Sequence, residues 1–381
     1  MKIRVLHIIK DDKFFDPVIE DFLKDDRFEN KSVLFVETEN YSCRYIQHSE
    51  LVDLLWSDQM IKERLESDTY DVLFFHSIMT QYWKYFKYIP KNIIVIWWCW
   101  GYELYHKVYG MTPILQIDLY KPKTTILIED FKSRKEKFKD FLKENFAKYF
   151  WYRIRKKIVR RVDYFQPVIP LEYEMMKSVK DFHAKEFYYP YCFSCCQDIK
   201  EKLSINPRGS IIIGNSASET NNHIDIWHRI KTFIPADRTV IIPLSYGHEY
   251  YAIAIEEMVK KDGLNIMFLR RFMPKEEYFT LMEGCSYAIY GVMRQQAMGN
   301  VYYALSHGLK LFLYKDSMVY KFLQKSGYVV FAIEDIDEDS FQTPLTMEQQ
   351  TQNRNAFSRE YTYREDTKEK AILEISNIVN Q

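Results

Sequence analysis

Short β-branched runs alternate with amphipathic stretches along most of this chain, and the alternation begins twice. The first series starts with KIRVLHII at residues 2–9, and the second starts with SIII at residues 210–213. Each run is short enough to be a buried strand, and the stretches between them suit helices that cover a sheet. This order favours parallel sheets with helices on both faces. A chain of 381 residues also suits two domains of about 150 to 200 residues each rather than one core.

The apolar pattern gives the expected positions of the strands and helices. In the first half we expect helices near 16–24 and 58–66 and strands at 2–9, 32–36, 71–76, 93–98 and 163–169. In the second half we expect helices at 248–261, 275–284 and 299–307, another that begins at 219, and strands at 210–213, 239–243, 265–269, 287–290 and 310–314. A last helix is predicted over 367–379, after a polar loop.

The predicted fold is α/β and GT-B-like, with two doubly wound Rossmann-like domains that face a cleft. The first domain is predicted over residues 1–195, the second over 205–360, and the C-terminal helix over 361–381, where it can pack back on the first domain. The periodicity lapses between Tyr188 and Arg208, which indicates a linker. Doubly wound sheets bind ligands outside the carboxyl ends of their strands, so we expect the substrates there.

A small polar loop follows the first strand of the second half and is typical of a phosphate site. The sequence from Gly209 to Asp225 reads GSIIIGNSASETNNHID. Glycine at 214 permits a tight turn, and Ser218 or Thr220 can cap the next helix. Because the first N–H groups of a helix have no partner within it, they attract anions. The candidate binding residues in this loop are Gly214, Asn215 and Ser216.

Three further loops of the second half leave predicted strands with polar residues. They contain Ser245, Tyr246 and Gly247, then Phe272 to Lys275, and then RQQAMGN with Arg294, Gln295, Gln296, Gly299 and Asn300. In the last loop a cation and two amides precede a helix start. A guanidinium and helix N–H groups together can hold a diphosphate. The alternative for Arg294 is an ordinary surface salt bridge.

Two residues of the first half are candidates for proton transfer. Glu103 lies in the Gly101 loop of the run WWCWGYELYH, where neighbouring tryptophans can raise the pKa of a carboxyl towards that of a general base. It can instead cap a helix or pair with Lys107. His76 closes the run DVLFFH and can contact a ligand, or it can be a satisfied core histidine.

The segment at residues 131–161 is strongly basic in a chain whose 53 basic and 53 acidic residues otherwise balance. It has thirteen Lys or Arg against three Asp or Glu. An apolar stripe recurs every four residues at Phe138, Leu142, Phe146, Phe150, Ile154 and Ile158. A basic helix with such a stripe suits the anionic inner face of a membrane. The alternatives are a solvated helix packed on its own domain and a nucleic-acid site, and we expect no nucleic-acid partner.

Other features of the composition narrow the class of protein. No run approaches the roughly 20 apolar residues that cross a bilayer, and residues 1–10 lack a leader cleavage site. Six cysteines, three of them at 192, 195 and 196, suggest neither a disulfide framework nor zinc spacing. Asp335 and Asp337 form an isolated DxD in an acidic turn. We therefore expect a cytoplasmic protein, peripheral on the inner face of the plasma membrane, with no metal and no other cofactor.

The chain resembles the TDP-N-acetylfucosamine:lipid II N-acetylfucosaminyltransferase family, also called the 4-alpha-L-fucosyltransferase family or glycosyltransferase family 56. The similarity is strongest from Ile211 to Leu313. There it rests on the GNS loop with Asn221 and His223, on PLSY at 243–246, and on RQQ with Gly299. In the first half it rests on a thinner set, namely His7, Asp12, His76, Trp100, Gly101, Leu104 and Tyr105.

The resemblance implies a GT-B fold and a glycosyltransferase without a catalytic metal. It implies a dTDP-linked 4-acetamido-4,6-dideoxy sugar as donor and a polyprenyl-diphosphate-linked oligosaccharide as acceptor. It also implies binding roles for Asn221 and His223 beside the residues named above. The family has Asp at the position of Glu103, whose extra methylene moves the carboxyl by roughly 1.5 Å.

Two other functions fit the same sequence features. A sugar-nucleotide epimerase on this fold would need no acceptor and would convert the donor alone. A non-catalytic protein that binds a membrane or nucleic acid through residues 131–161 would show steeply salt-dependent binding and no need for Arg294.

Overall fold

The structure, a computed structural model, describes residues 2–12, 14–67, 69–107, 111–132, 148–189 and 208–380. The chain forms two compact units. The first comprises Met1–Gln116, Phe138–Cys192 and Tyr363–Gln381, and the second comprises Ile117–Lys137 and Phe193–Thr362. Most of the predicted linker, the three clustered cysteines and residues 133–147 of the basic segment lie outside the described residues.

The first unit is built on a parallel sheet of seven strands. In chain order these are β1 (Ile3–Ile9), β2 (Phe28–Phe35), β3 (Val52–Leu55), β4 (Val72–His76), β5 (Ile94–Trp98), β6 (Tyr164–Gln166) and β7 (Lys185–Glu186). They lie side by side in the order β3-β2-β1-β4-β5-β6-β7, and every pair is parallel. All five residues of β4 are buried, as expected for a central strand covered on both faces.

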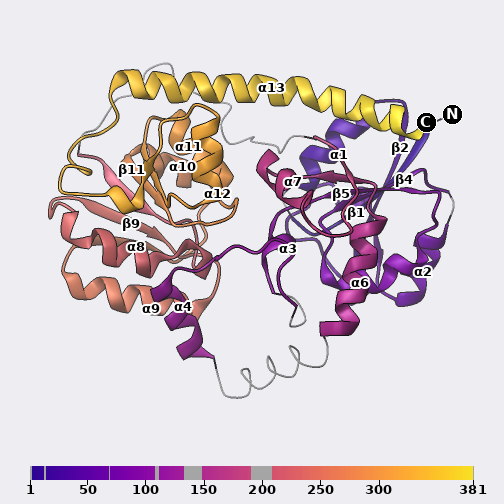
Figure 1. Ribbon diagram of the computed structural model, residues 1–381, viewed down its shortest axis with the longest axis horizontal. Coiled ribbons are helices and arrows are strands. Elements are labelled where there is room, and N and C mark those ends of the chain that lie inside the picture. The colour runs from indigo at the N-terminus through magenta and orange to yellow at the C-terminus, as the bar shows by residue number, and fades with distance from the viewer. Residues whose placement is uncertain are drawn as a thin grey trace. The chain divides into compact units, whose positions relative to one another are not determined.

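Helices cover both faces of this sheet. On one face α1 (Phe15–Leu23) and the end of α13 (Met347–Val379) join a core with strand residues such as Val5, Phe74 and Ile96. In Figure 1 the helices α2 (Asp58–Glu66) and α6 (Lys148–Arg161) lie on the other side of the strands from α1. The other helical segments among the described residues of this unit are η1 (Ser49–Leu51), η2 (Thr80–Tyr88), α3 (Tyr102–Tyr105) and α7 (Pro170–Met176).

The second unit repeats the plan with six parallel strands. They are β8 (Ser210–Ile213), β9 (Thr239–Pro243), β10 (Asn265–Leu269), β11 (Cys285–Tyr290), β12 (Lys310–Leu313) and β13 (Phe331–Ala332), in the order β10-β9-β8-β11-β12-β13. Both sheets therefore have the strand order of a doubly wound Rossmann fold, which confirms the predicted fold class.

Helices also cover both faces of the second sheet. Figure 1 shows α8 (His223–Ile230) and α9 (Glu249–Val259) on one side of the strands. It shows α10 (Lys275–Glu283), α11 (Met298–Ser306) and α12 (Met318–Lys325) on the other. Short 3-10 turns complete the unit, namely η5 (Glu219–Asn221), η6 (Lys231–Phe233), η7 (Lys260–Asp262) and η8 (Ile333–Asp335).

The long C-terminal helix differs most from the expectation. A polar loop was predicted before residue 367, but α13 already begins at Met347. Its first half shows little apolar periodicity because buried amides hold it. Asn353 is fully buried, accepts from Val329 N (2.6 Å) and donates to Val329 O (3.1 Å). Two polar bonds therefore replace the apolar contacts that sequence periodicity would have revealed.

The residues before the basic segment belong to the second unit, although the predicted boundary put them in the first. Helix α4 (Pro122–Phe131) begins there, and the side chain of Asp225 accepts from the amides of Lys123 (2.9 Å) and Thr124 (2.8 Å). Asn222 accepts from Lys121 N (2.8 Å). Carboxylate and amide groups from the start of α8 thus satisfy the free N–H groups of α4 and fix it there.

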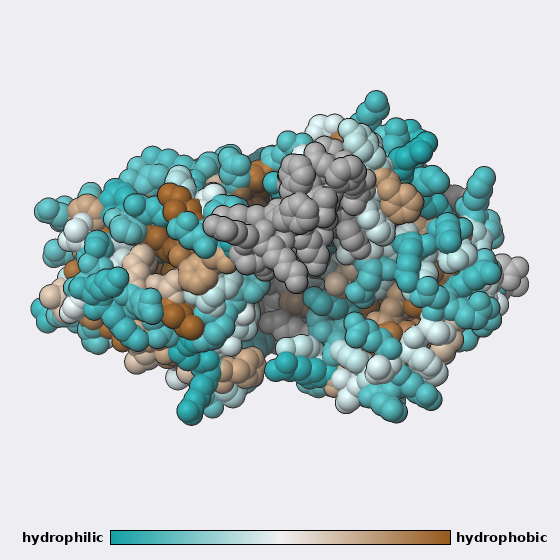
Figure 2. Space-filling model, turned by 90° about the horizontal axis from the view of Figure 1, so that it is seen from below, coloured by the Kyte–Doolittle hydropathy of each residue, from teal (hydrophilic) through white to brown (hydrophobic). Residues whose placement is uncertain are grey.

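The hydropathy of the surface and of the helices bears on the expected membrane contact. On the face shown in Figure 2, hydrophilic side chains predominate and hydrophobic ones form several separate patches. Among the described residues, no helix is both long enough and apolar enough to cross a bilayer.

The packing of α13 on the first sheet gives a test of the fold. Ile375 is fully buried in the core with Val5 and Phe74, whereas Leu373 on the same helix is 46% exposed. We expect Ile375→Ala to lower the free energy of unfolding by about 2 to 5 kcal/mol, and Leu373→Ala by less than about 0.5 kcal/mol. Urea denaturation followed by tryptophan fluorescence measures both. Equal effects would mean that this face of α13 is not packed on the sheet.

Candidate functional site

The loop after β8 is shaped by one buried amide. Asn221 is fully buried, and its side chain accepts from Asn215 N (3.2 Å) and donates to Ser216 O (3.2 Å) and Ser216 Oγ (3.1 Å). Asn221 is therefore fully used in holding the loop. Gly214, Asn215 and Ser216 form the turn that this amide holds at the edge of the sheet.

Gly214 turns the chain directly above a buried histidine. Its φ is +70°, and a Cβ there would lie 2.2 Å from His223 Nε2, so a larger residue would collide with the ring. Burial lowers the pKa of His223 to about 4. The ring is accordingly neutral near pH 7, and it supports the turn by packing rather than by charge.

The loop after β9 is fastened beside the loop after β8. Ala217 N donates to Tyr246 O (2.7 Å), and His248 N donates to Ala217 O (2.9 Å). Gly247 lies against this contact with φ of +117°, where a Cβ would lie 2.4 Å from Ala217 C. Asn215 Nδ2 donates to Tyr246 OH (2.8 Å), and the tyrosine is 58% exposed. The edge of the sheet thus presents an aromatic ring next to the Asn215 amide, with Ser245 half-buried beside it.

The loop after β11 is tied to the same place by two side chains. Asn222 Nδ2 donates to Gly291 O (2.7 Å), and Thr220 Oγ1 donates to Gln296 Oε1 (2.7 Å). A Cβ at Gly291 would lie 2.3 Å from Asn221 O, so only glycine allows this approach. The strands β8 and β11 are neighbours at the point where the strand order reverses. Three loops consequently meet where doubly wound sheets bind ligands.

The start of α11 supplies the positive end of a helix at this edge. Its N-cap is Ala297, which has a left-handed φ of +56° and no capping side chain. A non-glycine residue in this region costs roughly 1 to 2 kcal/mol, and such strain is concentrated at functional sites. Gly299 lies in the first turn. Asn300 donates to Tyr278 OH (3.2 Å), so its side chain is engaged with α10.

Arg294 and Gln295 precede this helix. Arg294 is half-buried, and its Nη1 donates to Gln295 O (2.7 Å), while Gln295 itself is buried. Burial raises the pKa of Tyr120, the negative charge of Glu219 adds to that shift, and the positive charge of Arg294 opposes it. A fixed guanidinium, backbone amides and a helix start on one edge can together bind a diphosphate.

Several residues of this edge were missed or misread from the sequence. Asn222 and Ala297 were not predicted. The Asn-Asn pair is nevertheless a signal, since asparagine tolerates the left-handed conformation that Asn222 adopts. Ser218 and Thr220 were predicted as caps of the next helix. Instead their hydroxyls bond to each other (2.9 Å), and α8 begins only after Asn222.

In the first unit, Glu103 fastens the loop after β5. Its Oε1 accepts from Trp97 Nε1 (3.2 Å) and Trp100 N (3.2 Å), and its Oε2 is buried without a hydrogen bond. Burial raises the pKa of this carboxyl. Gly101, with φ of +87°, turns the chain into α3 just before it. The carboxylate thus holds the loop between β5 and α3 in place.

His76 ends β4 at the same edge of the first sheet. It is 3% exposed, and its Nε2 lies 3.1 Å from His7 Nδ1. Burial, and then the neighbouring His7, lower the pKa of His76 well below its usual value. The next residue, Ser77, has a left-handed φ of +79°; its N donates to Trp98 O (2.9 Å) and its Oγ lies 2.7 Å from Tyr102 OH. The position of the ring is therefore fixed.

The described part of the basic segment is helix α6, whose later residues pack and form ion pairs within the first unit. Helix α6 packs Ile158 on its own unit, and Lys156 (3.1 Å) and Arg160 both pair with Asp181. Arg161 pairs with Asp163 (2.8 Å). Part of the basic charge is therefore neutralised within the unit, which the sequence count did not reveal.

The beginning of α6 is different. Tyr149, Phe150 and Tyr152 are 70%, 63% and 47% exposed, and Arg153 and Lys157 are exposed as well. Of the predicted apolar stripe, Ile158 is buried within the unit, whereas Phe150 is exposed on the surface.

A metal cluster and a surface hollow are two other features that could indicate a site. Within the part of the chain that the structure describes, no three His, Cys, Asp or Glu residues could hold a metal ion. The two aspartates of the DxD make separate contacts, Asp335 with Lys315 (2.6 Å) and Asp337 with Ser340 (2.7 Å).

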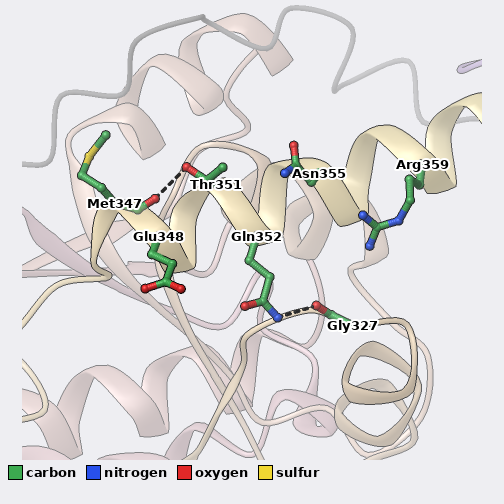
Figure 3. A pocket seen from close by; sticks show the side chains of 7 residues that line it. All are labelled: Gly327, Met347, Glu348, Thr351, Gln352, Asn355 and Arg359. Atoms are coloured by element: carbon green, nitrogen blue, oxygen red, sulfur yellow. Dashed lines mark hydrogen bonds between the residues drawn. The ribbon is translucent and has the colours of Figure 1, made fainter.

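A hollow of about 640 Å³ along α13, shown in Figure 3, is lined by Gly327, Met347, Glu348, Thr351, Gln352, Asn355 and Arg359. None of these was predicted as a site residue.

Several solved structures are similar to the whole chain. Sucrose-phosphate synthase from Thermosynechococcus elongatus has a TM-score of 0.60 at 9% identity over 100% of this chain and 99% of that one. A glycosyltransferase from Rickettsia africae has a TM-score of 0.59 at 10% identity over 99% and 98%. Anabaena HepE, solved with UDP and glucose, has a TM-score of 0.57 at 12% identity over 97% and 99%. At these identities the similarity shows the fold, which is GT-B.

The sequence itself matches a family over more than half of its length. Residues 139–366 match the sequence model of 4-alpha-L-fucosyltransferase, glycosyl transferase group 56. This span includes all three loops at the edge of the second sheet. The reaction class is therefore glycosyl transfer rather than epimerisation or binding alone, and the chain belongs to the 4-alpha-L-fucosyltransferase family, glycosyl transferase group 56.

Proposed function

We propose that this glycosyltransferase moves a 4-acetamido-4,6-dideoxy sugar from a dTDP-sugar to a polyprenyl-diphosphate-linked oligosaccharide in bacterial surface polysaccharide synthesis. The observation that carries the donor assignment is the meeting of three loops at the β8–β11 reversal. Hydrogen bonds from Asn221 and Asn222 hold the loops after β8 and β11, and the backbone of Ala217 holds the loop after β9. The sugar and the nucleotide follow from the family resemblance. That Anabaena HepE was solved with UDP and glucose agrees with a nucleoside diphosphate site on this fold.

Each group at this edge has a role in the proposed mechanism. Breaking the bond between sugar and phosphate places negative charge on the leaving diphosphate. Arg294 and the first amides of α11 provide positive charge for that diphosphate, next to the loop at Gly214 to Ser216. They stabilise the transition state more than the ground state because the charge grows as the bond breaks. Tyr246 and Asn215, which bond to each other, offer a ring and an amide to the donor.

The acceptor is assigned to the carboxyl edge of the first sheet. His76 ends a central strand there, next to the β1–β4 reversal. We assign the contact with the acceptor hydroxyl to His76. Glu103 holds the Gly101 loop in place, because its Oε1 already accepts two bonds and its Oε2 is buried.

The lipid carrier places the enzyme on the inner face of the plasma membrane in this proposal. The exposed Tyr149, Phe150 and Tyr152, with Arg153 and Lys157, support this contact. Aromatic rings suit the level of the lipid headgroups, and basic side chains attract anionic lipid. Lys156, Arg160 and Arg161 contribute less because they have acidic partners within the unit.

The function is tested by donor and acceptor together. We expect transfer from a dTDP-4-acetamido-4,6-dideoxy sugar to a polyprenyl-diphosphate oligosaccharide, and much slower transfer from UDP and GDP sugars. Product formation is measured by chromatography and mass spectrometry of the lipid fraction. Without acceptor, only slow hydrolysis of the donor is expected. Equal rates with all three nucleotides, or transfer to a water-soluble sugar alone, would contradict the proposal.

Arg294 gives the sharpest test of the donor site. We expect Arg294→Ala to lower kcat/KM about a hundredfold, since removing one preorganised donor costs about 3 kcal/mol of transition-state stabilisation. The matched control is Arg359→Ala, which removes the same charge from an exposed position on α13 of the same unit (Figure 3). Wild-type turnover in a folded Arg294→Ala enzyme would refute the assignment.

The membrane contact is tested on α6. Replacing both Tyr149 and Phe150 with Ser should weaken binding to vesicles that contain phosphatidylglycerol by about tenfold, because two exposed rings no longer enter the interface. The control is Tyr363→Ser, since Tyr363 is 59% exposed on α13. Sedimentation with the vesicles measures the binding. Equal sedimentation of both variants would mean that the start of α6 does not touch the lipid.

A further inference from the structure

A line of hydrogen bonds leads from a backbone carbonyl to His76. Asn30 Nδ2 donates to Phe22 O (3.4 Å). Asn30 Oδ1 lies 3.2 Å from His7 Nε2, and His7 Nδ1 lies 3.1 Å from His76 Nε2. The line connects α1, β2, β1 and β4, and it ends at the carboxyl edge of the first sheet.

The carbonyl at one end sets the direction of every hydrogen in this line. A carbonyl can only accept, so the NH₂ group of Asn30 faces Phe22 and its oxygen faces His7. His7 Nε2 must then carry a hydrogen. A neutral imidazole has one N–H, so His7 Nδ1 accepts and His76 Nε2 donates to it. His76 Nδ1 is left with a lone pair.

This assignment requires that both rings are neutral. Burial lowers the pKa of His7 to about 4, and the bond with Asn30 opposes that shift only in part. The pKa of His76 is lowered well below its usual value. The rings packed against the two imidazoles carry no charge; they are Phe15, Phe22, Phe74 and Trp98. Among the described residues, the ionisable group that acts on His76 is therefore His7.

The free end of the line lies at the strand terminus. His76 is the last residue of β4 and keeps 3% of its surface exposed. Its Nδ1 makes no hydrogen bond to the described residues. Ser77 and Trp98 hold the following backbone, so the ring cannot turn away without breaking the bond to His7.

We propose that His7 and Asn30 are positioning residues. They hold His76 as the tautomer with hydrogen on Nε2, so that Nδ1 accepts a hydrogen bond from a hydroxyl of the acceptor saccharide. The identity of that hydroxyl rests on the proposed function, whereas the tautomer follows from the hydrogen-bond line alone.

The same line predicts a reversal when His7 becomes charged. A protonated His7 carries hydrogen on both nitrogens, so its Nδ1 donates to His76 Nε2. His76 then carries its hydrogen on Nδ1 and can no longer accept from a hydroxyl. A carboxylate at position 30 would stabilise the charged ring and raise the pKa of His7.

Nitrogen NMR of the full chain tests the tautomer without substrate. In ¹⁵N-histidine protein near pH 7.5, the His76 signals, assigned by their loss in His76→Asn, should show a protonated Nε2 and an unprotonated Nδ1. In Asn30→Ala, which removes the end of the line, they should show a mixture of tautomers. Hydrogen on Nδ1 of His76 in the wild type, or no change in Asn30→Ala, would overturn the proposal.

Kinetics test the consequence of the tautomer. We expect Asn30→Ala to lower kcat about tenfold and to leave the KM for the donor unchanged. A tenfold loss is smaller than the 10² to 10⁴ that a positioned proton acceptor contributes, because His76 itself is still present. Asn30→Asp should keep the rate at high pH and lose it as pH falls through the raised pKa of His7. The control is Lys31→Ala, exposed on the same strand. Because a merely structural role would give no new acid limb, its absence would overturn the proposal.

The two readouts separate this inference from the proposed function. The NMR result depends only on the hydrogen-bond line, so it stands even if the donor or acceptor class is wrong. A folded His76→Ala enzyme with wild-type kcat would overturn the contact with the hydroxyl. Failure of the donor panel, in contrast, would leave the spectra unchanged.

Discussion

The reversal of strand order between β8 and β11 is the constraint on which the candidate donor site depends. At such a reversal the connections of two adjacent strands leave in opposite directions, and a gap opens between their loops. Polar side chains must then pair with the backbone N–H and C=O groups in that gap. Asn221 and Asn222 do so from the start of α8. Both are fully buried, and together they bond the loops after β8 and β11 and the start of α4. The guanidinium of Arg294 and the start of α11 lie at the edge that these bonds hold together, and both suit an anion.

The corresponding reversal in the first sheet has a different chemistry. There the strands β1 and β4 bring two buried histidines together, and the surrounding rings keep both neutral. One edge thus offers positive charge and N–H groups, and the other offers a lone pair in an aromatic setting. This division fits a reaction in which one substrate leaves as a diphosphate and the other brings a hydroxyl. The repeated fold supplies the scaffold, and the loops supply the difference.

Much of the fold could be predicted because apolar periodicity is a local property of the sequence. The bounds of β8, β9, β10 and α2 agree with the residues expected from the sequence, and the fold class followed from the repeated alternation. Strand β13 was missed because two residues give no periodicity, and β3 because its exposed edge position gives only weak alternation. The beginning of α13 was missed because buried amides such as Asn353 replace its apolar face.

The three loops of the candidate site were identified from the sequence, but the hydrogen bonds between them were not. Glycines 214 and 247 and the RQQ segment marked the loops, since glycine and clustered polar residues stand out in sequence. The roles of Asn222, Ala297 and Asn30 depend on contacts between distant segments and on backbone conformation, which no local pattern encodes. For Glu103, the neighbouring tryptophans in the sequence indicated a raised pKa of the carboxyl. They did not indicate that the carboxylate accepts hydrogen bonds from Trp97 and Trp100 and so holds the loop in place.

The central claim is that the donor diphosphate binds at the carboxyl edge of the second sheet. A crystal structure of the chain with dTDP measures this directly. The account predicts diphosphate oxygens within hydrogen-bond distance of Arg294, of the first amides of α11 and of the loop at Gly214. A nucleotide found instead in the hollow along α13 near Gly327, or at the first sheet beside His76, would contradict it.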